Sequence, residues 1–388
     1  MKKYFILAAA AAMFAACSNT DEITQTETPN ERIPLTIGAT YSVDPVVTMR
    51  GTSTTYQSTE LESTNVLGIF IRKNGSKAAK VTADTYEVDN VLSTGLTPAT
   101  RSTFKYMDVA ATGLYYPDAK SQKIDIYAYA PSSVMTTAPT TIGSFDIDLS
   151  AKTNQGTDAN YMANDILWGM EGTTNEISAN KYAAADKTDG TITGAYVGTG
   201  TGANVIIPMT HRGSKIVINL ATSGMDASKL DHATVKFMVD YTKGSMDLSN
   251  GEITTNTDAT NPNYVVSQPI TLTPAATTGP SPTGGLDATT HSCAAVILPQ
   301  VINAQETDKT TVKNPDNSNT NYRLIEITLS DGSTKYAYVV NTVQTFESAK
   351  VYTYNIIVTA SGLTLTTKVA DWVAGFSGTE GNGEATLE

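Results

Sequence analysis

The chain has 388 residues and a formal net charge of -12, with only 16% charged residues, three His and two Cys. The acidic charge excludes the basic surface of a nucleic-acid binder, and so few His and Cys argue against zinc clusters and disulfide frameworks. Its 62 threonines favour strands over surface helices. At ~100–200 residues per domain, the length predicts two or three domains.

The N-terminus has the pattern of an export signal followed by a lipidation site. A pair of lysines precedes the apolar stretch 4–16, which is shorter than the ~20 residues of a membrane-spanning helix. The stretch ends in two alanines that are followed by Cys17, which resembles a bacterial lipobox, although Phe14 stands where Leu is usual. We therefore predict that residues 1–16 are a signal peptide and that lipid, such as palmitate, on Cys17 holds the chain at the membrane. The alternative is a plain cleaved signal with an incidental Cys.

From residue 33 onward the hydrophobic period is that of strands. The segment 33–40 alternates and puts Ile33, Leu35, Ile37 and Ala39 on one face. Further strands are predicted over residues 66–71, 124–129, 205–207, 215–220, 235–241, 295–298, 324–329, 335–340 and 351–359. Many short strands separated by turns predict an all-β fold of antiparallel β-sandwiches.

Turn and breaker residues suggest how these strands are grouped. Asp331-Gly332 between two apolar runs predicts a hairpin, and residues 178–187 are the best candidate for a short helix. One strand is expected to end at Pro208, where a second series of strands begins. The predicted organisation is a tether over residues 17–32, an N-terminal sandwich domain over 33–208 and a C-terminal sandwich domain over 209–388.

Motifs for chemistry are scarce. Cys293 precedes an apolar run and is expected to be a buried free thiol, with His291 nearby but no third group to orient a catalytic pair. The glycine-rich stretch 198–204 lacks the Lys and the helix of a phosphate loop. The acidic clusters do not follow a calcium or glycosidase pattern. We expect no enzyme activity, no cofactor and no metal. Aromatic residues leave glycan binding open, although core packing explains most of them.

Several short motifs follow one another in a distinctive order. They are the lipobox at Cys17, residues 33–37, Arg50 followed by Gly51, and the segments 65–70, 115–117, 124–131, 164–169, 208–216, 296–300, 350–356 and 370–372. In this order they resemble the fimbrillin family, the pilin-like lipoproteins of Bacteroidales. The resemblance implies two transthyretin-like β-sandwiches in tandem, export to the outer membrane as a lipid-anchored precursor, and assembly with other subunits into adhesive surface fimbriae.

The family mechanism has a physical form in this sequence. Proteolytic cleavage between Arg50 and Gly51 would release the lipid and the strand 33–40, and would open a groove for a strand from another subunit. Arg32 and Arg72 are alternative cleavage sites. The alternative to cleavage at Arg50 is that this residue is an ordinary surface arginine. The glycine-rich residues 373–388 make a poor donor strand, which favours a tip or accessory subunit over a shaft subunit.

We therefore expect a structural or adhesive fimbrial subunit that contacts other subunits and the outer membrane, with a receptor on a host or bacterial surface as a further candidate partner. The alternative is a monomeric surface lipoprotein that binds glycans.

Overall fold

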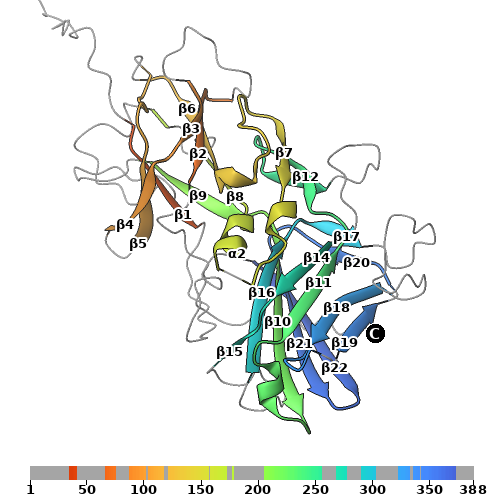
Figure 1. The fold of residues 1–388 in the computed structure, drawn as a ribbon. Helices are drawn as coiled ribbons and strands as arrows, with labels where there is room; N and C mark the ends of the chain where they lie inside the picture. Colours follow the sequence, from red (N-terminus) through yellow and green to blue (C-terminus); the bar gives the residue numbers. More distant parts are fainter. Residues whose placement is uncertain are drawn as a thin grey trace, which may run out of the picture.

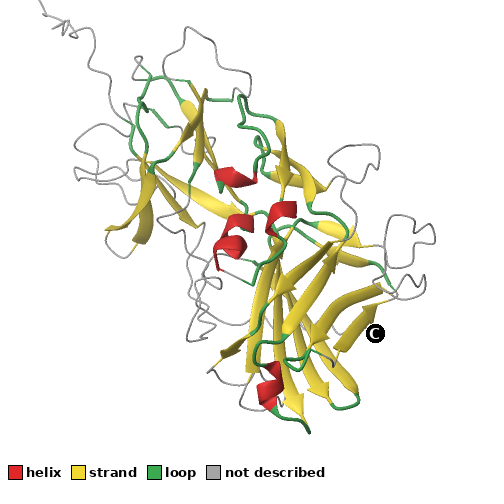
Figure 2. Cartoon of the chain, in the orientation of Figure 1, coloured by secondary structure: helices red, strands yellow, loops and turns green. Residues whose placement is uncertain are grey.

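The computed structural model describes residues 35–41, 66–75, 87–101, 104–117, 121–156, 158–172, 177–178, 205–255, 268–277, 290–302, 322–332, 335–340 and 342–372. Within these ranges the chain is built almost entirely of strands, with one α-helix, α2 (Asp158–Asn164), and short 3-10 helices (Figure 2). This confirms the predicted all-β class. The helix predicted over 178–187 lies outside the described residues apart from residue 178. None of the helices in these ranges has the length and hydropathy of a membrane span.

The first half of the chain forms one eight-stranded sheet that curls on itself. Its strands, in spatial order, are β3 (Val88–Leu92), β2 (Gly68–Lys73), β6 (Ile124–Ala130), β8 (Leu167–Glu171), β9 (Val205–His211), β1 (Ile37–Tyr41), β5 (Phe104–Ala110) and β4 (Gly95–Arg101) (Figure 1). The two outermost strands, β3 and β4, are joined by only two residues. Two residues span at most about 11 Å between the strand ends. The ends of the sheet must therefore lie close together, and one face becomes an interior.

Strand β6 shows how the two faces of this sheet are used. All seven of its residues are buried. Ile124 and Ile126 belong to the core enclosed by the curled sheet, whereas Tyr127 and Tyr129 belong to a second core on the opposite face. Successive side chains of β6 therefore alternate between the two faces, as expected of a strand. Apolar residues point to both faces because both faces are covered.

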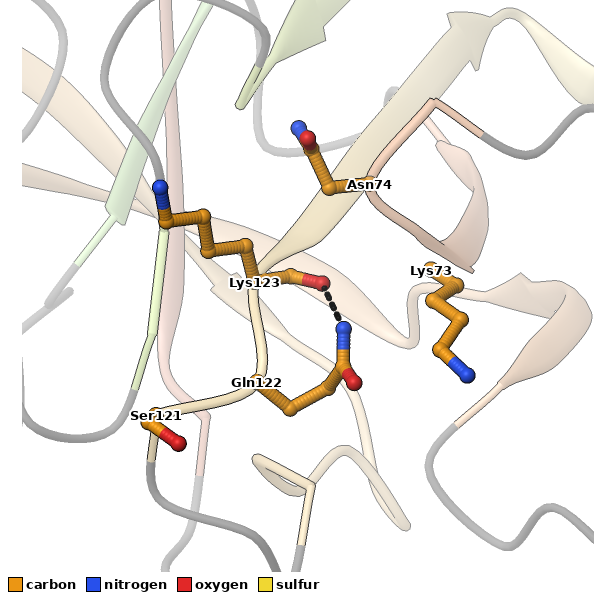
Figure 3. A pocket seen from close by; sticks show the side chains of 5 residues that line it. All are labelled: Lys73, Asn74, Ser121, Gln122 and Lys123. Carbon is orange, nitrogen blue, oxygen red and sulfur yellow. Dashed lines mark hydrogen bonds between the residues drawn. The ribbon is translucent and has the colours of Figure 1, made fainter.

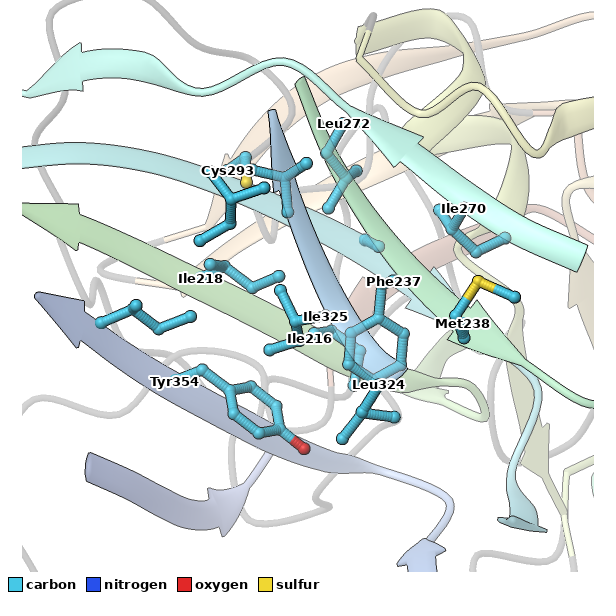
Figure 4. Close-up of a cluster of buried hydrophobic side chains, with 14 of the residues drawn as sticks. Ile216, Ile218, Phe237, Met238, Ile270, Leu272, Cys293, Leu324, Ile325 and Tyr354 are labelled. Carbon is cyan, nitrogen blue, oxygen red and sulfur yellow. The ribbon is translucent and has the colours of Figure 1, made fainter. Parts of the chain in front are cut away.

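The second half of the chain is a two-sheet sandwich. One sheet has the order β15 (Ala275–Thr277), β16 (Thr290–Ile297), β10 (Ser214–Ser223), β21 (Lys350–Thr359) and β22 (Gly362–Asp371). The other has the order β14 (Gln268–Leu272), β11 (Thr234–Val239), β18 (Tyr322–Thr328) and β19 (Lys335–Val340). Side chains of both sheets meet in one core, including Ile218 and Tyr354 from the first sheet and Phe237 and Ile325 from the second (Figure 4). The predicted hairpin joins β18 and β19, with Gly332 at φ +71°.

Two small sheets lie beside these units. One has the order β13 (Glu252–Thr255), β12 (Lys243–Asp247) and β7 (Ser144–Asp148), and the other pairs β17 (Gln300–Ile302) with β20 (Gln344–Phe346). Since β7 comes from the first half and β12 from the second, the three-stranded sheet ties the halves together. Trp168 strengthens this connection by donating a hydrogen bond of 2.9 Å from its Nε1 to the carbonyl of Leu248.

The strand expected to end at Pro208 continues to His211, so that prediction was wrong. The residue pairs between β8 and β9 begin only at Met209. The missing N–H of Pro208 therefore removes no bond to β8, and the strand tolerates the proline. The domain boundary predicted between residues 208 and 209 falls within β9 and stays a prediction.

Candidate assembly site

Strand β1 occupies an interior position of the curled sheet although it is the first strand of the described chain. It pairs in parallel with β9, from Ile37 opposite Val205 to Tyr41 opposite Met209. On its other side it pairs antiparallel with β5, from Ile37 opposite Val109 to Ala39 opposite Met107. Two backbone hydrogen bonds extend this contact beyond the strand, from Leu35 N to Leu114 O at 3.0 Å and from Val205 N to Thr36 O at 3.1 Å. The segment is therefore held by main-chain bonds along both of its edges.

The predicted apolar face of this segment is the face that points into the core. Leu35, Ile37 and Ala39 are 4%, 2% and 0% exposed, whereas Thr36 between them is exposed. All three belong to the interior core of the curled sheet, which also contains Val205, Ile207 and Met209 of β9 and Leu96 of β4. Ile33, the fourth residue of the predicted face, lies outside the described residues.

Removing β1 would leave a gap with defined chemistry. The facing edges of β9 and β5 would carry N–H and C=O groups without partners, and the three side-chain positions would open onto the apolar core. Unpaired strand edges beside an apolar floor bind an extended segment that alternates apolar and polar residues. The geometry of β1 is therefore that of a slot for one strand.

The residues predicted to control access to this slot are only partly described. Cys17, Arg50 and Gly51 lie outside the described residues, as does Arg32. Arg72, the third candidate for cleavage, is 0% exposed and pairs with Asp89. It also donates from Nη1 to the carbonyl of Val88 at 2.8 Å. A protease cannot reach such an arginine in the folded chain, so Arg72 is not a cleavage site there.

A polar cluster that the sequence analysis missed lies between the two halves. Asp165 accepts a hydrogen bond from His211 over 2.7 Å, and the His211 ring stacks on Trp372 with centroids 3.9 Å apart. The ammonium of Lys215 lies 5.9 Å from the centre of the Tyr161 ring and 5.7 Å from that of Trp372. Burial lowers the pKa of Lys215 to about 8, while the charge of Asp165 acts in the opposite direction.

The signal for this cluster was present in the sequence. Asp165 lies in the segment 164–169, and His211 and Lys215 lie in the segment 208–216, both of which carry the family resemblance. Neither segment by itself says that the two would meet. The pairing of β8 with β9 brings the two segments together, and such a long-range pairing has no local sequence pattern.

The other candidate residues have structural positions. Cys293 is 2% exposed within the C-terminal core, and burial raises the pKa of its thiol. His291 is bound instead to Asp231, with Nε2 2.7 Å from Oδ1. Among the aromatic residues that left glycan binding open, Tyr116, Tyr127, Tyr129 and Trp372 are buried, as core packing predicts, whereas Tyr115 and Trp168 are half-buried. In the described part of the chain, no three His, Cys, Asp or Glu side chains gather as a metal site would require.

A polar cavity of about 360 Å³ opens where β2 ends and β6 begins (Figure 3). It is lined by Lys73, Asn74, Ser121, Gln122 and Lys123. Gln122 donates from Nε2 to the Lys123 carbonyl at 2.9 Å. The described residues of the lining offer ammonium, amide and hydroxyl groups. These groups suit hydroxyl or anionic groups of a ligand.

The fold of this chain is similar to the folds of solved structures. The chain is similar to a "putative cell adhesion protein" from Bacteroides ovatus, with 14% identity, coverage of 89% of this chain and 100% of that one, and a TM-score of 0.54. A second "putative cell adhesion protein", from Bacteroides uniformis, has 17% identity, coverage of 88% and 98%, and a TM-score of 0.50. These likenesses define a class of all-β proteins with a shared fold. A search of curated proteins gives no match.

The family follows from the sequence itself. A model of the fimbrillin-like family matches residues 52–372, which is most of the chain. The chain therefore belongs to the fimbrillin-like family, and the resemblance drawn from its motifs is confirmed.

Proposed function

We propose that this protein is a structural or adhesive subunit of a cell-surface fimbria, exported as a lipoprotein precursor and assembled by strand exchange. In this account lipid on Cys17 anchors the precursor in the outer membrane. Cleavage after Arg50 then frees the lipid-bearing segment together with β1. An extended strand of another subunit fills the vacated slot and joins the two chains.

The observation that carries the proposal is the position of β1. It lies between two strands of the same sheet, contributes Ile37 and Ala39 to the core together with Leu35 just before it, and is followed within nine residues by Arg50. A segment that is both inserted in a sheet and close to a cleavable arginine can be removed without cutting any other described strand. Membership of the fimbrillin-like family supports the same function.

We further propose that this subunit is a tip or accessory component. A donor strand needs alternating apolar residues, and the segment 373–388, which lies outside the described residues, has four glycines and only three sizeable apolar residues. A chain with a slot but a weak donor would end a fimbria rather than extend it. Deleting residues 377–388 tests this: assembly in the presence of other subunits should be unchanged. Long filaments of the intact protein alone, abolished by the deletion, would contradict it.

The experiment that tests strand exchange is an Arg-specific digestion followed by electrophoresis in SDS without heating. Cleaved subunits mixed with partner subunits should give ladders that survive the detergent, because strand-exchanged subunits separate slowly. Arg50→Lys should abolish the ladder, since Lys keeps the charge but is not cut, whereas the matched control Arg32→Lys should not. Ladders formed by Arg50→Lys would overturn the assigned cleavage site.

Lipid anchoring has its own test. Cys17→Ala should prevent labelling by a radioactive fatty acid and release the protein from the membrane fraction. Continued labelling of the variant would show that Cys17 is not the lipidated residue.

A monomeric, glycan-binding lipoprotein remains the second candidate, and the polar cavity in Figure 3 is the observation in its favour. The two accounts differ in a direct binding measurement. Saturable affinity for an oligosaccharide that is lost in Lys123→Ala, without any polymer after cleavage, would favour the alternative.

A further inference from the structure

The open edges of the described sheets are protected to different degrees. A free strand edge pairs with other chains unless it is short, interrupted by proline or irregular, or carries charges. Strand β4 contains Pro98 and β14 contains Pro269. The pairings that hold β3 and β19 are broken by register shifts, and β13, β15, β17 and β20 have four residues or fewer. Strand β7 has five residues, two of them aspartates.

Strand β22 has fewer of these protections: its charged residues are Lys368 and, at its last position, Asp371, which pairs with Lys350 of β21. It runs for ten residues at the edge of its sheet and contains no proline. Its register with β21 is unbroken from Lys350 opposite Asp371 to Thr359 opposite Gly362. Among the described edge strands it is therefore the longest and the most regular.

The hairpin fixes which main-chain groups of β22 face outward. Ala360 and Ser361 form a two-residue turn, so Thr359 and Gly362 are a hydrogen-bonded pair. Such pairs alternate with non-bonded pairs along an antiparallel ladder. The even-numbered residues of β22 therefore bond to β21, while Leu363, Leu365, Thr367 and Val369 direct their N–H and C=O groups to the open edge.

The side chains of these outward-facing residues are incompletely covered as well. Leu363 and Leu365 pack against the C-terminal core but remain partly exposed, and Val369 is 37% exposed. A further strand along this edge would cover them and pair the free main-chain groups in one step.

We propose that β22 is a docking surface for a second copy of this chain, which pairs β22 with β22 antiparallel about a two-fold axis at Thr366. In this register Leu363 of each copy lies opposite Val369 of the other, and Leu365 lies opposite Thr367. Lys368 lies opposite Thr364, so no like charges meet. The two five-stranded sheets become one continuous sheet of ten strands.

The self-complementary sequence is the reason to choose a second copy over an unrelated peptide. On the inner face Leu363 meets Val369 and Leu365 meets Thr367, and Lys368, the only charged residue among the paired residues 362–370, meets the hydroxyl of Thr364. The paired residues 362–370 form a contact about 30 Å long, which we expect to bury less than the ~1,200 Å² of a stable complex, so a dissociation constant in the micromolar range is expected. The site is separate from the β1 slot, and the dimer does not depend on cleavage at Arg50.

The test measures mass against concentration by sedimentation, using the full chain with Cys17→Ser so that lipid cannot drive association. The protein should change from monomer to dimer between about 1 and 100 µM. Thr367→Pro removes an outward N–H but no bond to β21, and should leave a monomer of nearly unchanged melting temperature. Thr367→Ala, which keeps that N–H, should still dimerise. If the proline variant does not fold, Val369→Lys, which places a charge on the inner face of the edge, should abolish the dimer instead.

Charge changes at Thr364 distinguish pairing with a second copy from other association. Thr364→Glu places a carboxylate opposite Lys368 at two symmetric positions and should tighten the dimer about three- to tenfold, whereas Thr364→Lys should weaken it by a similar factor. A protein that stays monomeric at 100 µM would overturn the proposal. A dimer whose dissociation constant is unchanged by Thr367→Pro would also overturn it, as would equal effects of Glu and Lys at residue 364 on that constant. Such a dimer would form through another surface or register.

Discussion

Strands β1 and β21 occupy comparable positions in the two halves and differ mainly in length. Each lies within a sheet and pairs in parallel on one side and antiparallel on the other. Strand β1 shares five residue pairs with β9 and three with β5. Strand β21 shares ten with β10 and ten with β22. The same local arrangement is therefore built once with a short ladder and once with a long one.

The shorter ladder of β1 makes it the strand that the chain can lose. Strand β1 has a connection to the rest of the chain on one side that contains Arg50, and it contributes only a few side chains to its core. Strand β21 contributes Tyr352, Tyr354, Ile356 and Val358 and is continuous with β22. Loss of β1 would leave seven paired strands around a gap, whereas loss of β21 would separate β10 from β22.

The same Ile→Asp substitution should have different effects in the two strands, and the larger effect is expected in β21. Ile356 is 0% exposed at the centre of the C-terminal core. Ile356→Asp buries an unpaired carboxylate. Because β21 is paired along its whole length on both sides, the strand cannot leave the sheet to expose this group, so we expect loss of the folded C-terminal half. Near-ultraviolet circular dichroism should show that tertiary signal is lost. A folded variant with a normal melting transition would contradict the role given to β21.

Ile37→Asp in β1 should have a smaller effect. The carboxylate can reach water if β1 leaves its slot, so the cost is limited to the burial of Leu35 and Ile37, about 3–6 kcal/mol at ~1.5–3 kcal/mol for each side chain. The variant should fold, melt at a lower temperature and resemble a chain that begins at Gly51. Thr36→Asp, at an exposed position of the same segment, is the control and should melt as the wild type does. Complete unfolding of Ile37→Asp would show that β1 is not dispensable.

How much of this could be read from the sequence depends on the range of the interaction. The alternation of Leu35, Ile37 and Ala39 predicted the buried face of β1, because a strand's period is local. The neighbours of β1 could not be predicted, since β9 lies more than 160 residues away and nothing in either segment encodes their pairing. Strand β22 was missed for a related reason: its many threonines hide an alternation that becomes clear only beside β21.

The polar cluster around Lys215 should make the unfolding free energy depend on pH, with an effect of intermediate size. Burial lowers the pKa of Lys215 from its usual 10.5 to about 8, so the unfolded chain binds more protons between pH 8 and 10.5. Below pH 8 the buried ammonium lowers the unfolding free energy by its full amount. This loss of unfolding free energy decreases as the pH rises towards 10.5. Relative to Lys215→Met, the wild type should gain on the order of 2–3 kcal/mol of unfolding free energy between pH 7 and pH 10.

Urea unfolding of both proteins across this pH range measures the gain, and comparing the two cancels the titration of tyrosines and Cys293. Parallel curves for wild type and Lys215→Met would mean that Lys215 keeps its ordinary pKa.

The smallest expected effect concerns the bond that ties β8 to the second half. Trp168→Phe keeps an aromatic ring over Arg212 but removes the hydrogen bond to the Leu248 carbonyl. The expected loss is about 1 kcal/mol of unfolding free energy. Tyr336→Phe, a hydroxyl deletion far from this bond, is a suitable control. A loss above ~3 kcal/mol would show that the two halves depend on this contact far more than one hydrogen bond explains.

Peptide complementation measures whether a separate strand can take the position of β1. The melting temperature of a chain beginning at Gly51 is measured alone and with a synthetic peptide of residues 33–42. The account predicts that this chain melts about 10 °C below the precursor and that the peptide restores the loss saturably, whereas the same peptide with Ile37→Asp does not. Equal melting temperatures for the two chains, or rescue by the Asp peptide, would contradict it.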